Sequence, residues 1–252
     1  MRKSIRLFGV ATLLATGLTS CKTAYLLKED FSADATGYSP KKDIAGEPTG
    51  DFLTYKEALT PRLTVEASAV KAGTKALAFS EAAIKSSSVL DGYFSFNGLP
   101  ADYSKATRFE WTAKHRNSVG TLMIDVMGPQ NLWITRLYLR PDGQLLRVTD
   151  VTKQDGDVIG TLDLTQPHTI FITLKAEDAK KPKPQLYTFN ILVLSTNEGK
   201  DSNRLNWPVL FEPDPNVSTT VANTMLLSFS YQHEGADAKS AYVFESVNIV
   251  QQ

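Results

Sequence analysis

Apolar and polar residues alternate with a period of two along most of the chain from residue 25 onward. The alternating stretches are rich in Thr, Val, Tyr, Phe and Ile, and turn residues interrupt them roughly every eight to twelve positions. We see no long amphipathic helix, so the pattern predicts an all-β domain. The expected strands cover residues 25–32, 62–67, 75–79, 89–96, 106–115, 119–127, 131–140, 144–150, 158–164, 168–175, 185–195, 223–232 and 241–250.

The stretch 106–115 shows how the two faces of a strand are assigned. Side chains of successive strand residues point to opposite faces of a sheet. One face of this stretch is apolar and is expected in the core, with Phe109, Trp111 and Ala113. The other face is polar and is expected to meet water, with Arg108, Glu110, Thr112 and Lys114.

Turns and loops are predicted where Gly, Pro, Asp and Asn gather. Reversals are expected at Gly128-Pro129, Pro141-Asp142-Gly143, Asp155-Gly156-Asp157 and Gln166-Pro167. Residues 33–50 and 197–221 lack periodicity and predict long loops, and 176–185 predicts a solvated hairpin tip. A short helical turn is the alternative at 81–87 or at Pro61.

The first 21 residues follow a different pattern. Arg2, Lys3 and Arg6 precede an apolar run over 7–18, and small residues then lead to Cys21, the only cysteine of the chain. This segment resembles a bacterial lipoprotein signal. The resemblance implies a signal peptide over 1–20, cleavage before Cys21 and lipidation (palmitate) of that residue. This run of twelve positions falls short of the roughly 20 apolar residues that cross a bilayer.

The lipoprotein resemblance also predicts where the protein resides. Lys22 occupies the position at which such lipoproteins carry Asp when they stay at the inner membrane, so the outer membrane of a Gram-negative cell is expected. Residues 21–24 form the lipidated tether and 25–252 a single domain. Which face of the membrane carries it stays open.

Charge and cysteine content narrow the range of partners. The full chain has 27 basic and 27 acidic residues; removing the signal removes three basic ones, which leaves the mature chain near −3. A weakly acidic chain is not expected to bind nucleic acid. With Cys21 acylated no internal disulfide can form, so the domain must be stabilised by its core.

Three stretches carry a resemblance to a known fold. They are Glu29-Asp30-Phe31 before a Gly and Pro loop, the run 133–139 before Pro-Asp-Gly, and the closing strand 241–249. The chain resembles the concanavalin A-like lectin and glucanase jelly roll, which includes laminin G-like modules. The resemblance implies a two-sheet antiparallel β-sandwich with first and last strands paired, and a concave face on which relatives bind or cut glycans.

A glycosidase of that fold would carry a Glu-x-Asp-x-Glu or Glu-x-Asp-x-x-Glu motif, and none is present. One carboxylate pair is still a candidate, if stretches 106–115 and 119–127 form a hairpin. Pairing His115 with Gly120 places Glu110 opposite Asp125, at the spacing of a retaining glycosidase. Pairing His115 with Ser118 instead places Arg108 opposite Asp125 as an ion pair. We favour the second register, because opposed like charges destabilise a sheet.

Glycan binding needs an aromatic surface beside planar polar groups. One face of 131–140 offers this mixture, and we expect the ligand-binding residues to be Arg136, Tyr138, Arg140 and, from the long loop, Trp207. The alternative is that Arg136 and Arg140 pair with acids on neighbouring strands.

Metal and cofactor chemistry has little support in the sequence. His115, His168 and His233 are widely spaced and are expected at the surface or at strand ends, without a zinc motif. Asp155-Gly156-Asp157 offers oxygens to calcium but lacks the spaced carboxylates of a calcium loop. We therefore expect no cofactor and no metal site, with a structural calcium ion at Asp155-Gly156-Asp157 as the alternative.

The sequence as a whole predicts a lipid-anchored cell-envelope protein with a non-catalytic, carbohydrate-binding β-sandwich that captures a polysaccharide or oligosaccharide. One alternative is a glycoside hydrolase or polysaccharide lyase that uses Glu110 and Asp125. Another is a structural or protein-docking envelope lipoprotein.

Overall fold

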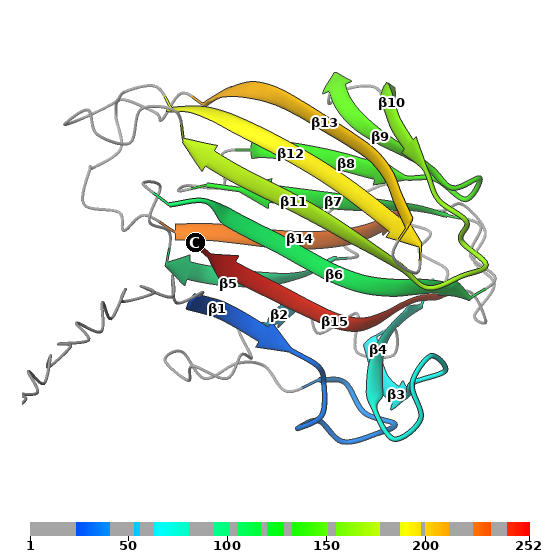
Figure 1. Ribbon diagram of the computed structural model, residues 1–252. Helices are drawn as coiled ribbons and strands as arrows, with labels where there is room; N and C mark the ends of the chain where they lie inside the picture. Colours follow the sequence, from blue (N-terminus) through cyan, green and yellow to red (C-terminus); the bar gives the residue numbers. More distant parts are fainter. Residues whose placement is uncertain are drawn as a thin grey trace, which may run out of the picture.

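The computed structural model describes residues 24–40, 53–55, 63–80, 93–100, 105–116, 120–128, 133–150, 155–176, 187–197, 200–211, 224–232 and 241–252. Within these ranges the regular structure is all strand (Figure 1). The strands are β1 (Ala24–Glu29), β2 (Leu53–Tyr55), β3 (Leu63–Ala67), β4 (Lys75–Ser80), β5 (Tyr93–Pro100), β6 (Thr107–Arg116), β7 (Thr121–Met127), β8 (Trp133–Leu139), β9 (Gln144–Asp150), β10 (Asp155–Thr161), β11 (His168–Ala176), β12 (Tyr187–Asn197), β13 (Lys200–Phe211), β14 (Thr224–Gln232) and β15 (Ala241–Gln251).

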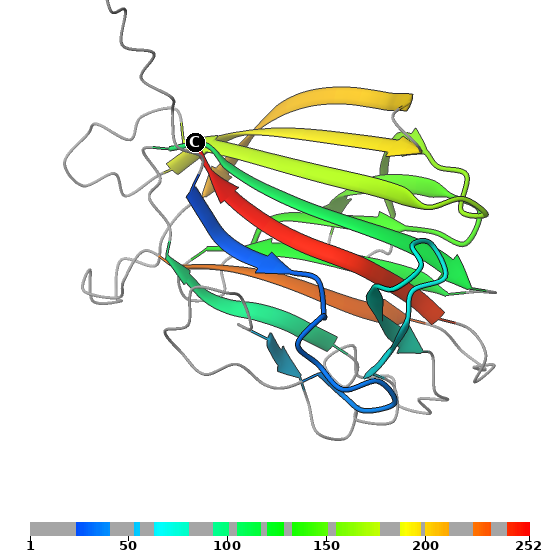
Figure 2. The same ribbon diagram turned by 60° about the horizontal axis from the view of Figure 1, so that its bottom comes forward.

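The strands form two antiparallel sheets. The eight-stranded sheet has the order β13-β12-β11-β6-β15-β4-β3, and β1 pairs with β15 beside β4. The seven-stranded sheet has the order β10-β9-β8-β7-β14-β5-β2. Figure 2 shows the two layers from a second direction. The predicted all-β sandwich is confirmed, and so is the pairing of the first and last strands that the jelly-roll resemblance implies.

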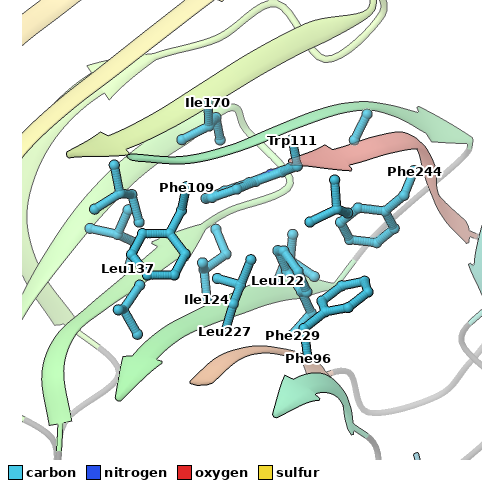
Figure 3. Close-up of a cluster of buried hydrophobic side chains, with 14 of the residues drawn as sticks. Phe96, Phe109, Trp111, Leu122, Ile124, Leu137, Ile170, Leu227, Phe229 and Phe244 are labelled. Carbon is cyan, nitrogen blue, oxygen red and sulfur yellow. The ribbon is translucent and has the colours of Figure 1, made fainter. Parts of the chain in front are cut away.

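The core lies between the sheets and consists largely of aromatic and branched side chains (Figure 3). Trp111 and Phe244 reach it from the eight-stranded sheet, and Phe94 and Phe229 from the seven-stranded sheet; each is fully buried. Phe94 stacks on Phe229 at 5.0 Å between ring centroids, and Phe244 meets both rings edge to face. Contacts between offset or perpendicular rings add to the stabilisation from burial, so this cluster ties the sheets together without a disulfide.

The face assignment predicted for 106–115 is confirmed by β6. Phe109, Trp111 and Ala113 are fully buried, whereas the residues between them are only partly buried. The predicted partner of this strand is wrong. β6 pairs with β11 and β15, while β7 pairs with β14 and β8 in the other sheet. The chain therefore crosses between the sheets after β6 instead of forming a hairpin.

Two expected loops contain strands. Residues 200–211 form β13 within the predicted loop 197–221, and Asp155-Gly156-Asp157 opens β10 instead of forming a turn. Both strands are at sheet edges, where one side of the backbone has no partner strand. An edge tolerates residues that weaken a central strand, such as Pro208 in β13 and Gly156 in β10. The helical turn considered for 81–87 or Pro61 and the hairpin tip at 177–185 lie outside the described residues.

No helix in the described part of the chain is long and apolar enough to cross a membrane. The predicted signal peptide and Cys21 lie outside the described residues, as does His233. Lipidation of Cys21 and the envelope location therefore stay predictions.

Candidate functional site

The outward face of the seven-stranded sheet, opposite the core, carries a line of polar residues that crosses the central strands. Ser95 on β5 pairs with Ser228 on β14, Ser228 pairs with Asp125 on β7, and Asp125 pairs with Arg136 on β8. We call these four residues the polar row. Their neighbours along each strand, such as Phe94 and Ile124, point into the core. Alternation therefore places the polar row on the opposite face.

Asp125 and Arg136 form a two-pronged ion pair at the end of this row. The Arg136 Nε and Nη2 groups donate to the two carboxylate oxygens of Asp125 at 2.6 and 2.7 Å. The pair is nearly closed to solvent, with exposed side-chain fractions of 11% for Arg136 and 6% for Asp125. Burial by itself lowers the pKa of Arg136, but the hydrogen bond and the charge of Asp125 outweigh it and raise that pKa. The guanidinium and the carboxylate therefore stay charged and compensate each other.

A second row runs beside the polar row and contains two tyrosines. Register aligns Tyr93, Ser230, Met123, Tyr138 and Leu146 across β5, β14, β7, β8 and β9. We call these five residues the mixed row. Tyr138 packs in a small apolar cluster with Met123 and Leu146. Burial raises the pKa of Tyr138, although the charge of Arg136 and a hydrogen bond with it act in the opposite direction. The two rows are thus linked through Arg136.

Hydroxyl and amide groups complete the surface. Ser95 Oγ donates to Asn97 Oδ1 at 2.8 Å on the same face of β5. Tyr93 and Asn97 are half-buried, so they are more open than Ser95, which is buried. Most members of the rows are buried, and the partly open groups of this face include Tyr93, Asn97 and Arg136. A tyrosine ring, an amide and a guanidinium are groups that recognise sugar faces and sugar hydroxyls.

The four predicted ligand-binding residues do not gather at one place. Arg136 and Tyr138 are neighbours on the outward face of β8. Arg140 lies just after β8 and forms an ion pair with Asp155 at 3.6 Å. Trp207 belongs to β13 in the other sheet, and its side chain lies outside the described ones. Both arginines pair with an acid from another strand, which is the alternative that the sequence left open.

Glu110 and Asp125 do not form a catalytic pair. Because β6 and β7 belong to different sheets, both hairpin registers considered for them are wrong. Glu110 lies on the outward face of the eight-stranded sheet, beside Arg108 at 3.2 Å, and pairs in register with Asn248 and Phe171. Asp125 lies on the outward face of the opposite sheet. The two carboxylates are therefore separated by the full thickness of the core.

On β7 the residues two positions before and after Asp125 are Met123 and Met127. These positions share the face of Asp125, so Asp125 has no second carboxylate next to it on this face of β7. Glycoside hydrolysis by the usual route needs two carboxyl groups, one as acid and one as nucleophile or base. Along the polar and mixed rows Asp125 is the only carboxylate, and Arg136 occupies both of its oxygens.

A second group of titratable residues lies inside the sandwich. His168 Nε2 and the hydroxyl of Tyr242 share a short hydrogen bond, and the ring of His115 meets Tyr242 at 4.5 Å between centroids. Burial lowers the pKa of His168 to about 4. Burial, with the nearby His168, lowers the pKa of His115 to about 3. His168 is at the start of its strand as expected, but the expectation of a surface position is wrong, because it is 1% exposed.

Among the described residues no group of three His, Cys, Asp or Glu side chains could hold a metal ion. Asp155, the first of the two acids considered for calcium, binds the backbone N–H of Gly156 through its own carboxylate and faces Arg140.

Sequence reasoning missed the serines and Tyr93 of the two rows. The signal was present, because 93–97 reads Tyr-Phe-Ser-Phe-Asn and 227–231 reads Leu-Ser-Phe-Ser-Tyr. In both stretches small polar residues alternate with buried aromatic ones. Alternation does not reveal that β5 and β14 are neighbours, however, and only that pairing aligns Ser95 with Ser228.

No protein-family model matches the chain, and comparison with curated proteins finds no match. Among solved structures, the chain is similar to SCLam, a non-specific endo-β-1,3(4)-glucanase from family GH16, with 12% identity over 92% of each chain and a TM-score of 0.49. It is also similar to a legume lectin-like domain from Entamoeba histolytica, with 9% identity over 79% of this chain and 96% of that one and a TM-score of 0.41.

A third similar structure is the carbohydrate recognition domain of Emp46p in its potassium-bound form. Its identity is 12% over 78% of this chain and 92% of that one, and its TM-score is 0.39. The similar structures have concanavalin A-like jelly-roll folds, as the sequence resemblance implied. A likeness of this degree does not extend to function, which has to be inferred from the side chains of this chain.

Proposed function

We propose that this chain is a lipid-anchored protein of the cell envelope that binds carbohydrate on the outward face of its seven-stranded sheet and does not cleave it. The observation that carries the proposal is the pair of rows across this face. Four strands contribute hydroxyl, carboxylate and guanidinium groups in line, and the adjacent row adds Tyr93, which is partly open, and Tyr138, which is buried. The sequence pattern at Cys21 supports the anchor.

The ion pair is suited to recognition of uncharged sugars. Two N–H groups of Arg136 hold Asp125, and this fixes the guanidinium plane in one orientation. A rigid, pre-oriented donor loses less entropy on binding than a free side chain does. Because the charges compensate, the site offers directed hydrogen bonds without attracting anionic polymers.

The absence of catalysis in this proposal follows from the same residues. Asp125 accepts hydrogen bonds from Arg136, and the residues two positions before and after it on β7 are methionines. Without a second carboxylate in the two rows, neither a retaining nor an inverting hydrolysis has its usual pair of groups.

A glycan array and affinity gels test the binding. The soluble fragment from Lys22 onward is applied together with two matched variants, Tyr93→Ser and Phe171→Ser. Both residues are half-buried aromatics on outward faces, but Tyr93 is on the seven-stranded sheet and Phe171 on the eight-stranded one. We expect retention by the parent and by Phe171→Ser, and loss of retention by Tyr93→Ser.

Two results would contradict the proposal. If the parent protein is retained on no polysaccharide, it does not bind carbohydrate. If only Phe171→Ser loses retention, the binding site lies on the eight-stranded sheet. A reducing-sugar assay, run on every polysaccharide that retains the protein, tests the proposal that the protein does not cleave its ligand. Release of reducing ends that is lost in Asp125→Asn, while the variant keeps the circular dichroism spectrum of the parent, would show that the face is catalytic.

A further inference from the structure

One end of the sandwich gathers the start of β1 and the end of β15. Ala24 pairs with Gln251, Gln251 pairs with Thr107 at the start of β6, and Thr107 pairs with Leu174 near the end of β11. In Figure 1 this end is where the C-terminus is marked and where β1 begins. We call it the anchor end.

The chain length between the predicted lipid site and the fold is very short. Only Lys22 and Thr23 separate Cys21 from Ala24. Since an extended chain spans at most about 3.6 Å per residue, Cys21 lies within roughly 11 Å of Ala24. β1 cannot swing away to lengthen this tether, because it is hydrogen-bonded along its length to β15.

We infer that the anchor end rests directly on the membrane and contacts the headgroups of anionic phospholipids. This inference rests on the proposed lipid anchor and adds the orientation of the domain. With so short a tether, the anchor end cannot leave the headgroup layer while the lipid stays inserted. The sandwich then contacts the bilayer through the anchor end, and no long linker separates the two.

The side chains at the anchor end fit such a surface. Tyr25 is 55% exposed, and the ammonium group of Lys28 lies 5.9 Å from the centre of its ring. Lys105 and Lys175 are also exposed, one just before β6 and one near the end of β11. Tyrosine is enriched at membrane interfaces, and lysines near an anionic surface are attracted to it.

The opposite end of the sandwich carries exposed acidic side chains. It includes the turn after β8 and the connection from β10 to β11, which are joined by the Leu162 N–H bond to the Gly143 carbonyl. Asp142 and Asp163 are exposed there. Arg116 ends β6 at the same end but is engaged by both carboxylate oxygens of Glu66. A negatively charged membrane would therefore attract the anchor end in preference to this one.

The orientation has a consequence for the proposed carbohydrate site. The long strands of both sheets, such as β6 and β15 in one and β7 and β14 in the other, run between the two ends (Figures 1 and 2). The outward face of the seven-stranded sheet therefore stands upright on the membrane, and the bilayer does not cover the polar row.

Single-cysteine labelling of the full lipidated chain tests the orientation. Acylation consumes the thiol of Cys21, so an introduced cysteine is the only free thiol. Lys175→Cys and Asp163→Cys place one fluorophore at each end, both at exposed positions. In vesicles of phosphatidylethanolamine and phosphatidylglycerol with nitroxide-labelled headgroups, we expect the label of Lys175→Cys to be quenched several-fold more strongly.

A second measurement tests the headgroup chemistry. We expect quenching of the Lys175→Cys label to fall when phosphatidylcholine replaces phosphatidylglycerol, and to fall also when Lys105→Glu is added. Unchanged quenching in both would overturn the assignment to anionic lipid. Equal quenching at the two ends, or stronger quenching in Asp163→Cys, would overturn the orientation.

Flotation with the vesicles separates these outcomes from a failure of the anchor. If the parent chain does not float, and Cys21→Ser behaves identically, both the anchor and the orientation are wrong. Retention of the soluble fragment on glycans is measured without a membrane, so it reports on carbohydrate binding independently.

Discussion

Asp125 and Arg136 are expected to be the most sensitive polar pair in the described part of the chain. Both side chains are nearly buried, and each removes the cost of burying the other's charge. Changing Arg136→Ala leaves an uncompensated carboxylate and is expected to lower the free energy of unfolding by about 3 to 5 kcal/mol. Urea denaturation measures the change.

The matched control is Arg116→Ala. Arg116 also makes a two-pronged contact, with Glu66, but both side chains are exposed to about a third or more, at 43% and 30%. An exposed pair contributes only about 0 to 1 kcal/mol. Equal losses in the two variants would show that burial does not decide the value of the Asp125 pair.

The two described histidines predict acid sensitivity. In the folded chain their pKa values lie at about 3 for His115 and about 4 for His168, mainly because of burial. In the unfolded chain both titrate near the ordinary value of about 6.5, so the unfolded chain binds more protons below that pH. Their contribution is therefore complete above about pH 6.5 and is lost as the pH falls toward the folded values. The free energy of unfolding falls by at most about 1.4 kcal/mol per pH unit for each histidine.

A double variant isolates this effect from the titration of carboxylates. His168→Leu with Tyr242→Phe removes both partners of a buried hydrogen bond and leaves neither unsatisfied. We expect the decline of unfolding free energy between about pH 6 and pH 4.5 to become roughly half as steep, measured by urea denaturation at each pH. An unchanged slope would mean that His168 does not hold its low pKa.

At the level of elements, the turn between β8 and β9 shows a sequence prediction that the structure confirms. Pro141-Asp142-Gly143 reverses the chain, and Gly143 has a φ of 85°. A Cβ atom at Gly143 would lie 2.2 Å from the carbonyl oxygen of Leu162. Two requirements therefore fix glycine here, a left-handed backbone and close approach of a second strand connection.

Gly73 allows these two requirements to be separated. Its φ is 80°, but a Cβ there would meet nothing within 4 Å. We expect Gly73→Ala to cost about 1 to 2 kcal/mol from backbone strain alone. Gly143→Ala should cost clearly more, because the Leu162 carbonyl must also move. Thermal unfolding compares the two, and equal costs would show that the connection yields freely.

The behaviour of β6 and β7 shows what a strand pattern does not contain. Alternation assigns the inward face of each strand correctly, with Trp111 on β6 and Ile124 on β7 in the core. It does not specify which strands are neighbours, because each inward face can pack in either sheet. The short connection between the two stretches predicted a hairpin, but β6 pairs with β15 and β7 pairs with β14. Both predicted registers for Glu110 and Asp125 depended on that hairpin and are therefore wrong.

At the level of the whole molecule, charge pairing predicts the class of glycan. The mature chain has a net charge near −3, and the described charges on the rows compensate each other. We expect retention on neutral polysaccharides to stay unchanged between about 0.05 and 0.5 M salt, because no long-range attraction is involved. Affinity electrophoresis in neutral and polyuronate gels measures it. Retention on polyuronate that salt abolishes would contradict the expectation.

The sequence by itself determined the local properties of this protein. A period of two fixes which side of each strand is apolar, Pro-Asp-Gly fixes a turn, and the order of charge, apolar run and cysteine predicts a lipid anchor. These depend on neighbours along the chain. The tertiary structure alone decided which strands meet, because pairing depends on packing between residues far apart in sequence. It separated Glu110 from Asp125, joined Asp125 to Arg136, and aligned Ser95 with Ser228.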